Sequence, residues 1–366
     1  MSASDRETIL VMSAGFGEGH NSAARNIAAA LTAESGGRVQ PVVIDPFTAA
    51  APNLSAFMKW GYQFMTNRMP GLWQWLYEST RQGNFGNHVW DRFVGLMHWL
   101  EEKLAETRPG TVVMTYPLYA SFLAGLNAAV PRPRRVYIAV TDSITIHPIW
   151  TQAPADRWFV TDDYSRDVVL SLGVAEEKCT VTGFATPASF AAGTSPERSG
   201  VLYLATTATR HVKSTLAGIL RDLPPSIPLT IITGRHEERL RPVIQKLLRQ
   251  HSGRQTTVHG WCTTIPEIMG RSSVVLTKAG GATVHECIAA GVPAVINYVI
   301  PGQEEGNAQL LEHTGCGCRS EDSALTGALL RELFTGGGLA AMTAAMQTHR
   351  QPHGARLMAQ DILAGR

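Results

Sequence analysis

The chain has 366 residues, of which 44% are hydrophobic and 17% charged, and its formal net charge is +2. This length exceeds what one hydrophobic core usually fills, so we expect two domains. The small net charge forms no basic run, which argues against nucleic-acid binding. The five cysteines are odd in number and scattered, as is typical of reduced thiols rather than of disulfides or a zinc site.

The sequence shows no targeting or membrane-spanning segment. The first apolar run, residues 9–16, follows mixed charges and is interrupted by glycine, unlike a signal peptide. No apolar stretch approaches the roughly 20 residues that a helix needs to cross a bilayer. We therefore expect the protein to stay on the cytoplasmic side.

The chain begins with a predicted strand at residues 8–12, a glycine-rich turn, and a helix from Asn21 to residue 33. The next strand, 39–44, ends at Asp45. An acidic residue in this place holds a ribose in dinucleotide-binding units. The glycine spacing argues against that interpretation, because His20 stands where the third glycine of G-x-G-x-x-G would allow close packing.

Two further predicted strands, 111–115 and 135–140, end at polar groups. Ligands of parallel sheets collect at the carboxyl ends of strands, so Asp142 is expected to converge with His20. A neutral histidine beside a carboxylate, within hydrogen-bond reach, is a workable general base near pH 7. In the alternative interpretation Asp142 only caps a turn. His147 is expected to be structural or to contact the acceptor.

Residues 54–100 have the most unusual composition of the chain. They contain five of the eight tryptophans, with basic residues between the aromatic ones. Such a mixture suits the headgroup layer of a bilayer, where rings are half hydrated and cations meet anionic lipid. Part of the segment must also belong to the core of the first domain. For the segment as a whole we predict a surface that faces an anionic membrane and admits lipid.

A small, polar stretch at residues 193–200 is typical of a linker, and we place the domain boundary near Phe190. After it, predicted strands at 201–205, 229–233 and 256–258 alternate with helices, as in a doubly wound sheet.

The strongest motif follows a short β-branched run at residues 273–277. Gly280 and Gly281 stand where that strand ends, and Thr283 offers a capping hydroxyl to the next helix. Strand, glycine turn and helix N-terminus form an anion site, because free N–H groups and the helix dipole point at the ligand. A diphosphate can approach the bare backbone closely, and the Glu286 carboxylate, one turn further, can accept hydrogen bonds from a ribose.

A second motif follows the strand at residues 294–297 and the turn at Pro301 and Gly302. It offers three side chains suited to sugar hydroxyls: Gln303, Glu304 and Asn307. A glycine pair alone would be weak evidence, but two spaced motifs together predict a nucleotide-sugar site.

These two motifs resemble the donor-site signature of the glycosyltransferase family that contains the monogalactosyl- and monoglucosyl-diacylglycerol synthases and, more distantly, the lipid II GlcNAc transferase. The resemblance covers nearly the whole chain. It implies an α/β fold of the GT-B type, with two Rossmann-like, doubly wound domains facing a cleft. Residues 1–190 would form the acceptor and membrane-facing domain, 191–350 the UDP-sugar domain, and 351–366 a helix that packs back on the first domain.

The family also implies roles for single residues. Glu286 would hold the ribose, and the polar residues after Pro-Gly would hold the sugar. The turn at Gly260 and Trp261 resembles the one whose backbone binds uracil. His20 matches the Gly-His that ends the first turn, which implies the general base, assisted by Asp142.

One stretch departs from the family. Residues 206–211 stand where glycines usually close over the donor phosphates. Threonine hydroxyls and Arg210 would bind phosphate there instead.

The implied activity is that of an inverting, metal-independent hexosyltransferase. It would move galactose or glucose from UDP-galactose or UDP-glucose to diacylglycerol, as a peripheral protein at the cytoplasmic face of the cell membrane. No cofactor or metal is expected besides the donor substrate. Two alternatives remain: a transferase of this fold with another lipid or a soluble acceptor, and a non-catalytic partner subunit that binds nucleotide-sugar or lipid. The sequence does not choose between glucose and galactose, which differ at one hydroxyl.

Overall fold

The computed structural model describes residues 6–81, 93–192, 197–251, 253–302 and 304–365. The chain forms two compact units. Unit 1 comprises Met1–Pro187, Pro301–Gly306 and His353–Arg366, and unit 2 comprises Ala188–Ile300 and Asn307–Pro352.

Unit 1 is built on a six-stranded parallel sheet of order β2-β1-β3-β4-β5-β6. The strands are β1 (Glu7–Met12), β2 (Val39–Ile44), β3 (Thr111–Met114), β4 (Arg135–Ala139), β5 (Arg157–Val160) and β6 (Cys179–Val181). Strand order reverses at β1, because β2 lies on one side of it and β3 on the other. Ligands of such sheets bind at this switch point, outside the carboxyl ends of the strands.

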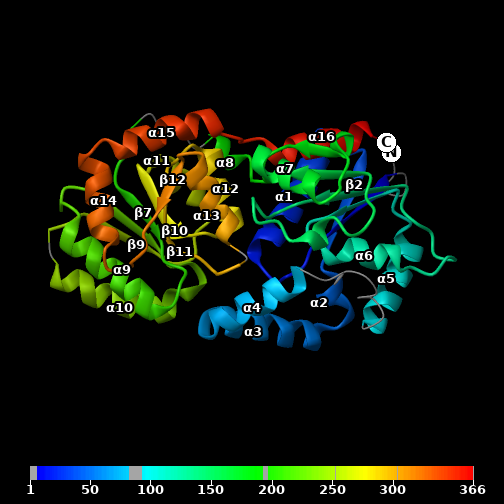
Figure 1. Cartoon of the computed structure of the whole chain (residues 1–366), viewed down its shortest axis with the longest axis horizontal. Helices are drawn as coiled ribbons and strands as arrows, with labels where there is room; N and C mark the ends of the chain where they lie inside the picture. Colours follow the sequence, from blue (N-terminus) through cyan, green and yellow to red (C-terminus); the bar gives the residue numbers. More distant parts are fainter. Residues whose placement is uncertain (1–5, 82–92, 193–196, 252, 303, 366) are drawn as a thin grey trace. The chain divides into compact units, whose positions relative to one another are not determined.

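The helices of unit 1 cover both faces of its sheet (Figure 1). They are α1 (Glu18–Glu34), α2 (Pro46–Ala50), α3 (Pro52–Arg68), α4 (Pro70–Arg81), α5 (Val94–Thr107), α6 (Leu118–Ala124), α7 (Asp163–Ser171) and α16 (Gly354–Ala364). The last of these packs against α1. Arg157 donates to the Asp361 carboxylate at 2.6 Å, which ties α16 to β5.

Helix α1 begins earlier than the sequence analysis expected. Gly17 is its N-cap, and Glu18 provides an acidic side chain in the first turn, which the helix dipole favours. Asn21 therefore does not cap the helix; its Oδ1 accepts a hydrogen bond from Ser13 Oγ at 2.7 Å. His20 therefore lies in the first turn of α1, which follows the glycine-rich loop at the carboxyl end of β1.

The segment with unusual composition divides between core and surface. The side chains of Leu96, Leu100 and Leu104 on α5 are fully or almost fully buried in the core of unit 1. Helices α3 and α4, which contact each other, instead carry most of the large hydrophobic side chains that are exposed. Phe85 and Trp90 lie outside the described residues. Part of the segment is thus core, and within its described residues most of the exposed large apolar side chains lie on α3 and α4.

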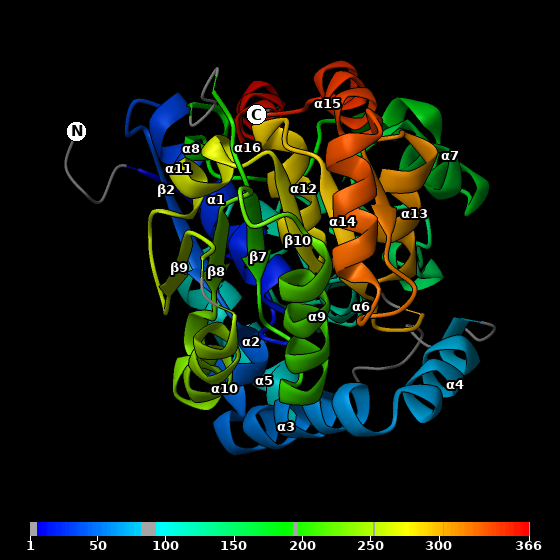
Figure 2. The same ribbon diagram turned by 90° about the vertical axis from the view of Figure 1, so that its left-hand side faces the viewer.

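Unit 2 has a second six-stranded parallel sheet, of order β12-β11-β10-β7-β8-β9. The strands are β7 (Val201–Leu204), β8 (Leu229–Ile232), β9 (Thr256–His259), β10 (Val274–Lys278), β11 (Ala294–Tyr298) and β12 (Gly317–Arg319). In Figure 2 the strands β9, β8, β7 and β10 lie side by side in this order. The two parallel sheets confirm the expected α/β class.

Helices flank the second sheet as well. They are α8 (Ser189–Ala192), α9 (Thr209–Asp222), α10 (Glu237–Gln250), α11 (Ile265–Arg271), α12 (Gly281–Ala290), α13 (Glu305–His313), α14 (Thr326–Thr335) and α15 (Gly338–His349). Helices α9 and α14 lie side by side in both views (Figures 1 and 2). They approach closely at Gly218, where a Cβ would overlap the carbonyl oxygen of Ala324.

In the parts of the chain that the structure describes, no helix combines the length and apolar character required to span a bilayer.

Candidate active site

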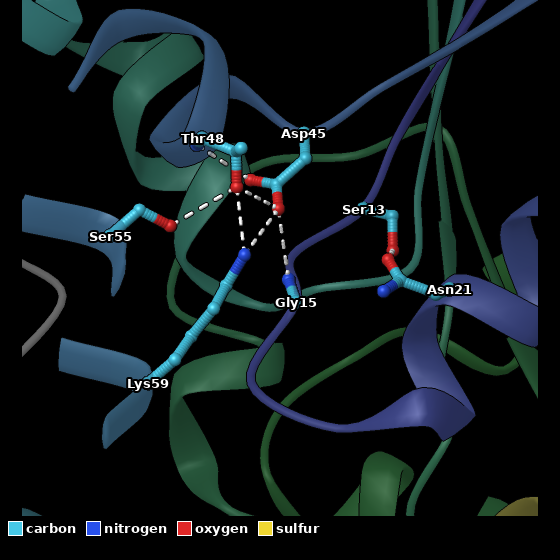
Figure 3. A network of polar contacts seen from close by, with 7 residues as sticks. All are labelled: Ser13, Gly15, Asn21, Asp45, Thr48, Ser55 and Lys59. Carbon is cyan, nitrogen blue, oxygen red and sulfur yellow. Dashed lines mark hydrogen bonds and ion pairs between the residues drawn. The ribbon is translucent and has the colours of Figure 1, made fainter. Parts of the chain in front are cut away.

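The loop after β1 is held by the carboxylate of Asp45, at the end of β2. Asp45 Oδ2 accepts hydrogen bonds from the Gly15 N–H at 3.1 Å, from Thr48 Oγ1 at 2.6 Å and from Lys59 Nζ at 3.2 Å. Its Oδ1 accepts from the Thr48 N–H at 3.0 Å and so caps α2. Figure 3 shows this network, which joins the glycine-rich loop to helix α3 through Lys59. Both oxygens of Asp45 have donors within the protein, so the dinucleotide interpretation has no free carboxylate for a ribose.

His20 is oriented by backbone and hydroxyl groups at the carboxyl ends of neighbouring strands. Its Nδ1 lies 2.7 Å from the carbonyl oxygen of Thr115 and 2.8 Å from Thr141 Oγ1. A carbonyl oxygen can only accept, so Nδ1 carries the proton and Nε2 keeps its lone pair. Burial lowers the pKa of His20, and Asp142 partly offsets this effect. The ring is therefore neutral near pH 7, with Nε2 as its basic atom.

Asp142 follows β4 and lines the same cavity as His20. Its Oδ2 accepts a hydrogen bond from Trp150 Nε1 at 2.7 Å. Burial raises the pKa of Asp142, while the charge of His20 and the bond from Trp150 lower it. Among the contacts of the described residues, none joins the carboxylate directly to the imidazole. Asp142 acts on His20 as a nearby charge, and the threonines that fix the ring were not singled out by the sequence analysis.

The backbone between Asp142 and His147 is strained. Ile144 has φ 53°, a left-handed conformation that β-branched residues rarely adopt. Its N–H donates to Ser165 Oγ at 3.1 Å, which holds the turn in place. Thr145 Oγ1 in turn accepts from the Gly306 N–H at 3.0 Å. Strain of this kind collects at functional sites.

His147 has a structural role in this loop. Its Nδ1 accepts a hydrogen bond from the Ile149 N–H at 3.1 Å, so Nε2 carries the proton and donates to Thr80 Oγ1 at 3.1 Å. Burial and, to a lesser degree, the charge of Arg81 lower the pKa of His147 to about 4. The neutral ring thereby ties α4 to the loop after β4.

A cavity of about 520 Å³ lies among α3, α4, the first turn of α1 with His20 and the loop that carries Asp142. This volume is within the range of small-molecule sites. Its walls are mostly apolar and aromatic, for example Phe16, Phe47, Met65, Trp73 and Tyr116. Burial raises the pKa of Tyr116 well above its usual value, so the phenol stays neutral. The structure thus brings His20 and Asp142 together at one apolar cavity, as the sequence analysis expected.

In unit 2, the glycine turn after β10 leads directly into α12. Gly280 is the N-cap and Gly281 the first helical residue, and no side chain caps the helix. The expectation that Thr283 supplies the capping hydroxyl is therefore wrong, because Thr283 already lies inside the first turn. The first N–H groups of α12 have no partner within the helix, as at every helix N-terminus, and they remain suited to an anion.

Glu286 lies one turn further along α12. Burial raises its pKa to about 8, so the carboxyl is mostly protonated at pH 7. Asn307 donates from Nδ2 to the Ala279 carbonyl oxygen at 3.0 Å, next to the glycine turn. The Asn307 Oδ1 is buried, and among the described residues it has no hydrogen-bond partner. In the described part of the chain, the turn at Gly280 is thus flanked by a half-buried acid and an unpaired amide oxygen.

The remaining predicted donor residues lie elsewhere. Glu304 is buried and belongs to unit 1, and Gln303 lies outside the described residues. Gly260 and Trp261 follow β9, at the opposite edge of the sheet from β12. Trp261 is 64% exposed, and the Arg235 guanidinium lies 4.8 Å from its ring centroid.

The loop that departs from the family is braced by an arginine that the sequence analysis missed. Arg239 donates to Thr209 Oγ1 at 2.8 Å and to the Thr207 carbonyl oxygen at 3.1 Å. Arg210 is exposed. Its charge is therefore available to an anion. Within the described residues, no group of three or more histidine, cysteine or acidic side chains is placed to hold a metal ion.

Two protein-family models match the chain. The model described as monogalactosyldiacylglycerol (MGDG) synthase matches residues 20–185, and the glycosyltransferase family 28 C-terminal domain matches residues 209–362. The chain is also 25% identical, over 348 residues, to the processive diacylglycerol beta-glucosyltransferase of Bacillus cereus (strain B4264). That alignment covers 88% of this chain and 86% of the relative.

Solved structures agree on the architecture. Acinetobacter baumannii MurG matches with a TM-score of 0.63 and 13% identity over 98% of this chain and 99% of MurG. Anabaena HepE in complex with UDP-glucose matches with a TM-score of 0.56 and 12% identity, over 99% and 100% of the two chains.

The fold is thus GT-B-like, and the protein is a glycosyltransferase. More particularly, the N-terminal part of the chain matches the monogalactosyldiacylglycerol synthase model, and its C-terminal part matches the glycosyltransferase family 28 C-terminal domain.

From the hydrogen bonds of Asp45 we predict how substitutions change the free energy of unfolding. Replacing Asp45 by Ala leaves the Gly15 N–H and the Lys59 ammonium without their acceptor, which costs about 1–3 kcal/mol in the free energy of unfolding. Lys59→Met removes only one donor, and its cost should be smaller. Denaturant unfolding of both variants and the double variant measures the coupling. Equal costs for the two single variants would contradict the central position of Asp45.

Proposed function

We propose that this enzyme transfers glucose from UDP-glucose to the free hydroxyl of 1,2-diacylglycerol with inversion at the anomeric carbon. The observation that carries the proposal is a neutral, buried histidine with a basic Nε2 beside a large apolar cavity. An apolar cavity suits a lipid, and a fixed imidazole suits removal of a proton from a hydroxyl. The proposal excludes the non-catalytic alternative and, for the acceptor, prefers a lipid to a soluble molecule.

The acceptor hydroxyl is activated by His20. As its oxygen attacks the anomeric carbon, the proton passes to Nε2, while Nδ1–H stays bound to the Thr115 carbonyl oxygen. The imidazolium formed in this step is stabilised by the negative charge of Asp142. The Trp150 indole, through its bond to Asp142, keeps the carboxylate in position and favours its ionised form.

The donor is assigned to the start of α12. The N–H groups after Gly280 and the positive end of the helix dipole favour the diphosphate and the charge that develops on UDP as it leaves. The ribose diol is assigned to Glu286, and the sugar to Glu304, Asn307 and Gln303. In this proposal no metal ion and no further cofactor take part, since the helix N-terminus supplies the stabilisation.

Glucose is preferred to galactose because of the relatives. The Bacillus cereus protein is named a diacylglycerol beta-glucosyltransferase, and HepE was solved with UDP-glucose. UDP-glucose is an α-glycoside, so a beta product requires inversion, which a single attack assisted by one base achieves.

We further propose that the enzyme is peripheral and meets the bilayer, at its cytoplasmic face, with α3 and α4. Trp60 is 60% and Trp75 67% exposed, and further large apolar side chains are exposed beside them: Leu54, Phe57, Phe64, Met69, Leu72 and Leu76. Exposed apolar patches of this kind mark interaction sites.

The basic side chains of this region are mostly paired. Lys59 bonds to Asp45, Arg81 lies 3.5 Å from Glu78, and Lys103 lies 2.9 Å from Glu106. Arg68, at the end of α3, is exposed. Attraction to anionic lipid therefore has fewer available cations than the sequence indicated, and apolar contact should contribute most of the binding.

Replacing His20 tests the base. We expect His20→Ala to lower kcat about 10²- to 10⁴-fold, the usual contribution of a general base, with little change in the KM for UDP-glucose. Because burial lowers the pKa of His20 from 6.5, the wild-type rate should hold its plateau at least down to that pH. The effect of the substitution and the pH dependence are both measured by incorporation of labelled glucose into diacylglycerol micelles, with excess EDTA throughout.

The matched control is His98→Ala, whose side chain is 73% exposed on α5 and should leave the rate unchanged. Full activity of His20→Ala would refute the assignment of the base, and loss of wild-type activity in EDTA would refute metal independence.

Glu286 makes donor binding depend on pH. Its pKa is raised to about 8 by burial, and ribose hydroxyls donate to the ionised carboxylate, so binding should release a proton. The affinity for UDP-glucose should then rise from pH 6.5 to pH 8, by up to about tenfold per unit, and level off above. Calorimetry in buffers of different ionisation enthalpy measures the proton, and Glu286→Gln should give a flat profile. A flat wild-type profile would count against the ribose assignment.

The membrane face is tested with liposomes. Trp60→Ser and Trp75→Ser should each weaken binding about tenfold or more, because a large buried apolar side chain contributes about 1.5–3 kcal/mol. The control Tyr164→Ser removes an aromatic ring that is 44% exposed on α7 and should have no effect. Binding to neutral vesicles should approach that to anionic ones. Unchanged flotation of the double tryptophan variant would disprove the assignment.

A further inference from the structure

We propose that the cavity beside His20 takes one acyl chain of the lipid acceptor, leaving the second chain outside, and that Gly61 keeps the space for this chain open. The inference rests on the proposed function, because it assumes a lipid acceptor. Beyond the proposed function, the inference states how much of the lipid the protein encloses. It also names the residue that determines the accepted chain length.

The volume of the cavity fits one chain. A methylene group takes about the volume of a water molecule in the liquid, about 30 Å³. The cavity of about 520 Å³ therefore holds roughly 17 such groups. Once the glycerol end is placed, space remains for about eleven carbons of one acyl chain. Two chains need about twice that space, so the second chain has to stay outside.

The lining gives the lipid a direction. His20 is 8% exposed and lies with Asp142 at the polar end of the cavity. Phe57 and Leu76, which also line it, are 66% and 37% exposed, so the cavity reaches the surface on the apolar side of α3 and α4. A lipid hydroxyl belongs at the polar end, and the acyl chain extends towards the exposed apolar side chains.

Gly61 lies in the middle of α3, where glycine lowers the stability of a helix. The local backbone and packing do not require glycine at this position. Glycine in a helix interior costs about 1 kcal/mol relative to alanine. Its φ is not positive, and a Cβ built on it meets no atom of the described residues within 4 Å. Gly218 in α9 differs, since there the neighbouring backbone leaves no room for a Cβ. Gly61 lines the cavity, so a side chain at this position would take up space that is free for a ligand.

The neighbours of Gly61 agree with this role. Met58, Gly61, Tyr62 and Met65 follow one another at helical spacing and all line the cavity. The two methionines are flexible and adapt to chains of different shape. On α3, Gly61 therefore leaves a gap in the cavity wall, and a flexible methionine lies on each side of it.

The test compares acceptors of different chain length. Transfer from UDP-glucose is measured for diacylglycerols and 1-monoacylglycerols with chains of 8 to 18 carbons. For the wild type we expect kcat/KM to rise about fourfold per methylene, the value of one buried methylene, and to level off when the cavity is full. Monoacylglycerols should follow the same curve, because only one chain is enclosed.

Gly61→Leu should shorten the preferred chain by about four carbons, the size of the added side chain, and favour short acceptors over long ones at least tenfold. The matched control is Gly71→Leu, which adds the same side chain to α4 at a position that is exposed, has no atom within 4 Å of a Cβ and does not line the cavity. Gly61→Ala should keep the wild-type profile nearly unchanged. An unchanged profile for Gly61→Leu, or the same shift in Gly71→Leu, would overturn the proposal.

Binding separates this inference from the proposed function. Equilibrium binding of a fluorescent 16-carbon monoacylglycerol should be saturable at one molecule per chain and weakened in Gly61→Leu but not in Gly71→Leu. If this pattern appears while the wild type transfers no glucose, the cavity inference stands and the proposed function fails. If the probe does not bind, or binds equally to both variants, the inference fails whatever the activity.

Discussion

The hydrogen bond between His20 Nδ1 and the Thr115 carbonyl oxygen is the contact on which the acceptor chemistry depends. A backbone carbonyl oxygen can only accept a hydrogen bond. The tautomer of His20 is therefore fixed by the main chain directly after β3 and not by a titratable side chain. This differs from a histidine oriented by a carboxylate, whose tautomer changes with the charge of its partner. Here Asp142 is left to act on the imidazolium as a charge, and its own position is set by Trp150.

The carboxylate of Asp45 connects this base to the cavity wall. It holds the glycine-rich loop that leads into α1 and, through Lys59, the helix that carries Gly61. The two sides of the acceptor site are therefore both attached to one half-buried carboxylate. Because an unpaired donor costs more than the bond contributes, the network positions α3 firmly even though its outer face consists of exposed apolar side chains.

The fold class and the two principal residues were predictable because their signals are local. Strand periodicity, the glycine turns and the family motifs placed His20 and Asp142 at strand ends, and parallel topology brought them together. Other features depend on contacts between distant segments. The role of Asp45 rests on Lys59, and the orientation of His20 rests on Thr115 and Thr141, about 95 and 121 positions away. The error at Thr283 had a local cause, since glycine served as the N-cap where a hydroxyl was expected.

The two units prepare their chemistry by different physical means. In unit 1 burial keeps His20 neutral. Its Nδ1 is engaged by Thr115 and Thr141, so Nε2 can accept a proton without rearrangement of the ring. In unit 2 burial raises the pKa of Glu286, and among the described residues the buried Asn307 oxygen has no donor. Buried polar atoms in this condition are rare and each costs about 1–3 kcal/mol. A ligand rich in hydroxyl groups removes that cost, and a sugar nucleotide is such a ligand. The hydrogen bonds of the His20 site in unit 1 are complete, which suits proton transfer. Unit 2 has an unsatisfied polar group, which suits recognition of the donor.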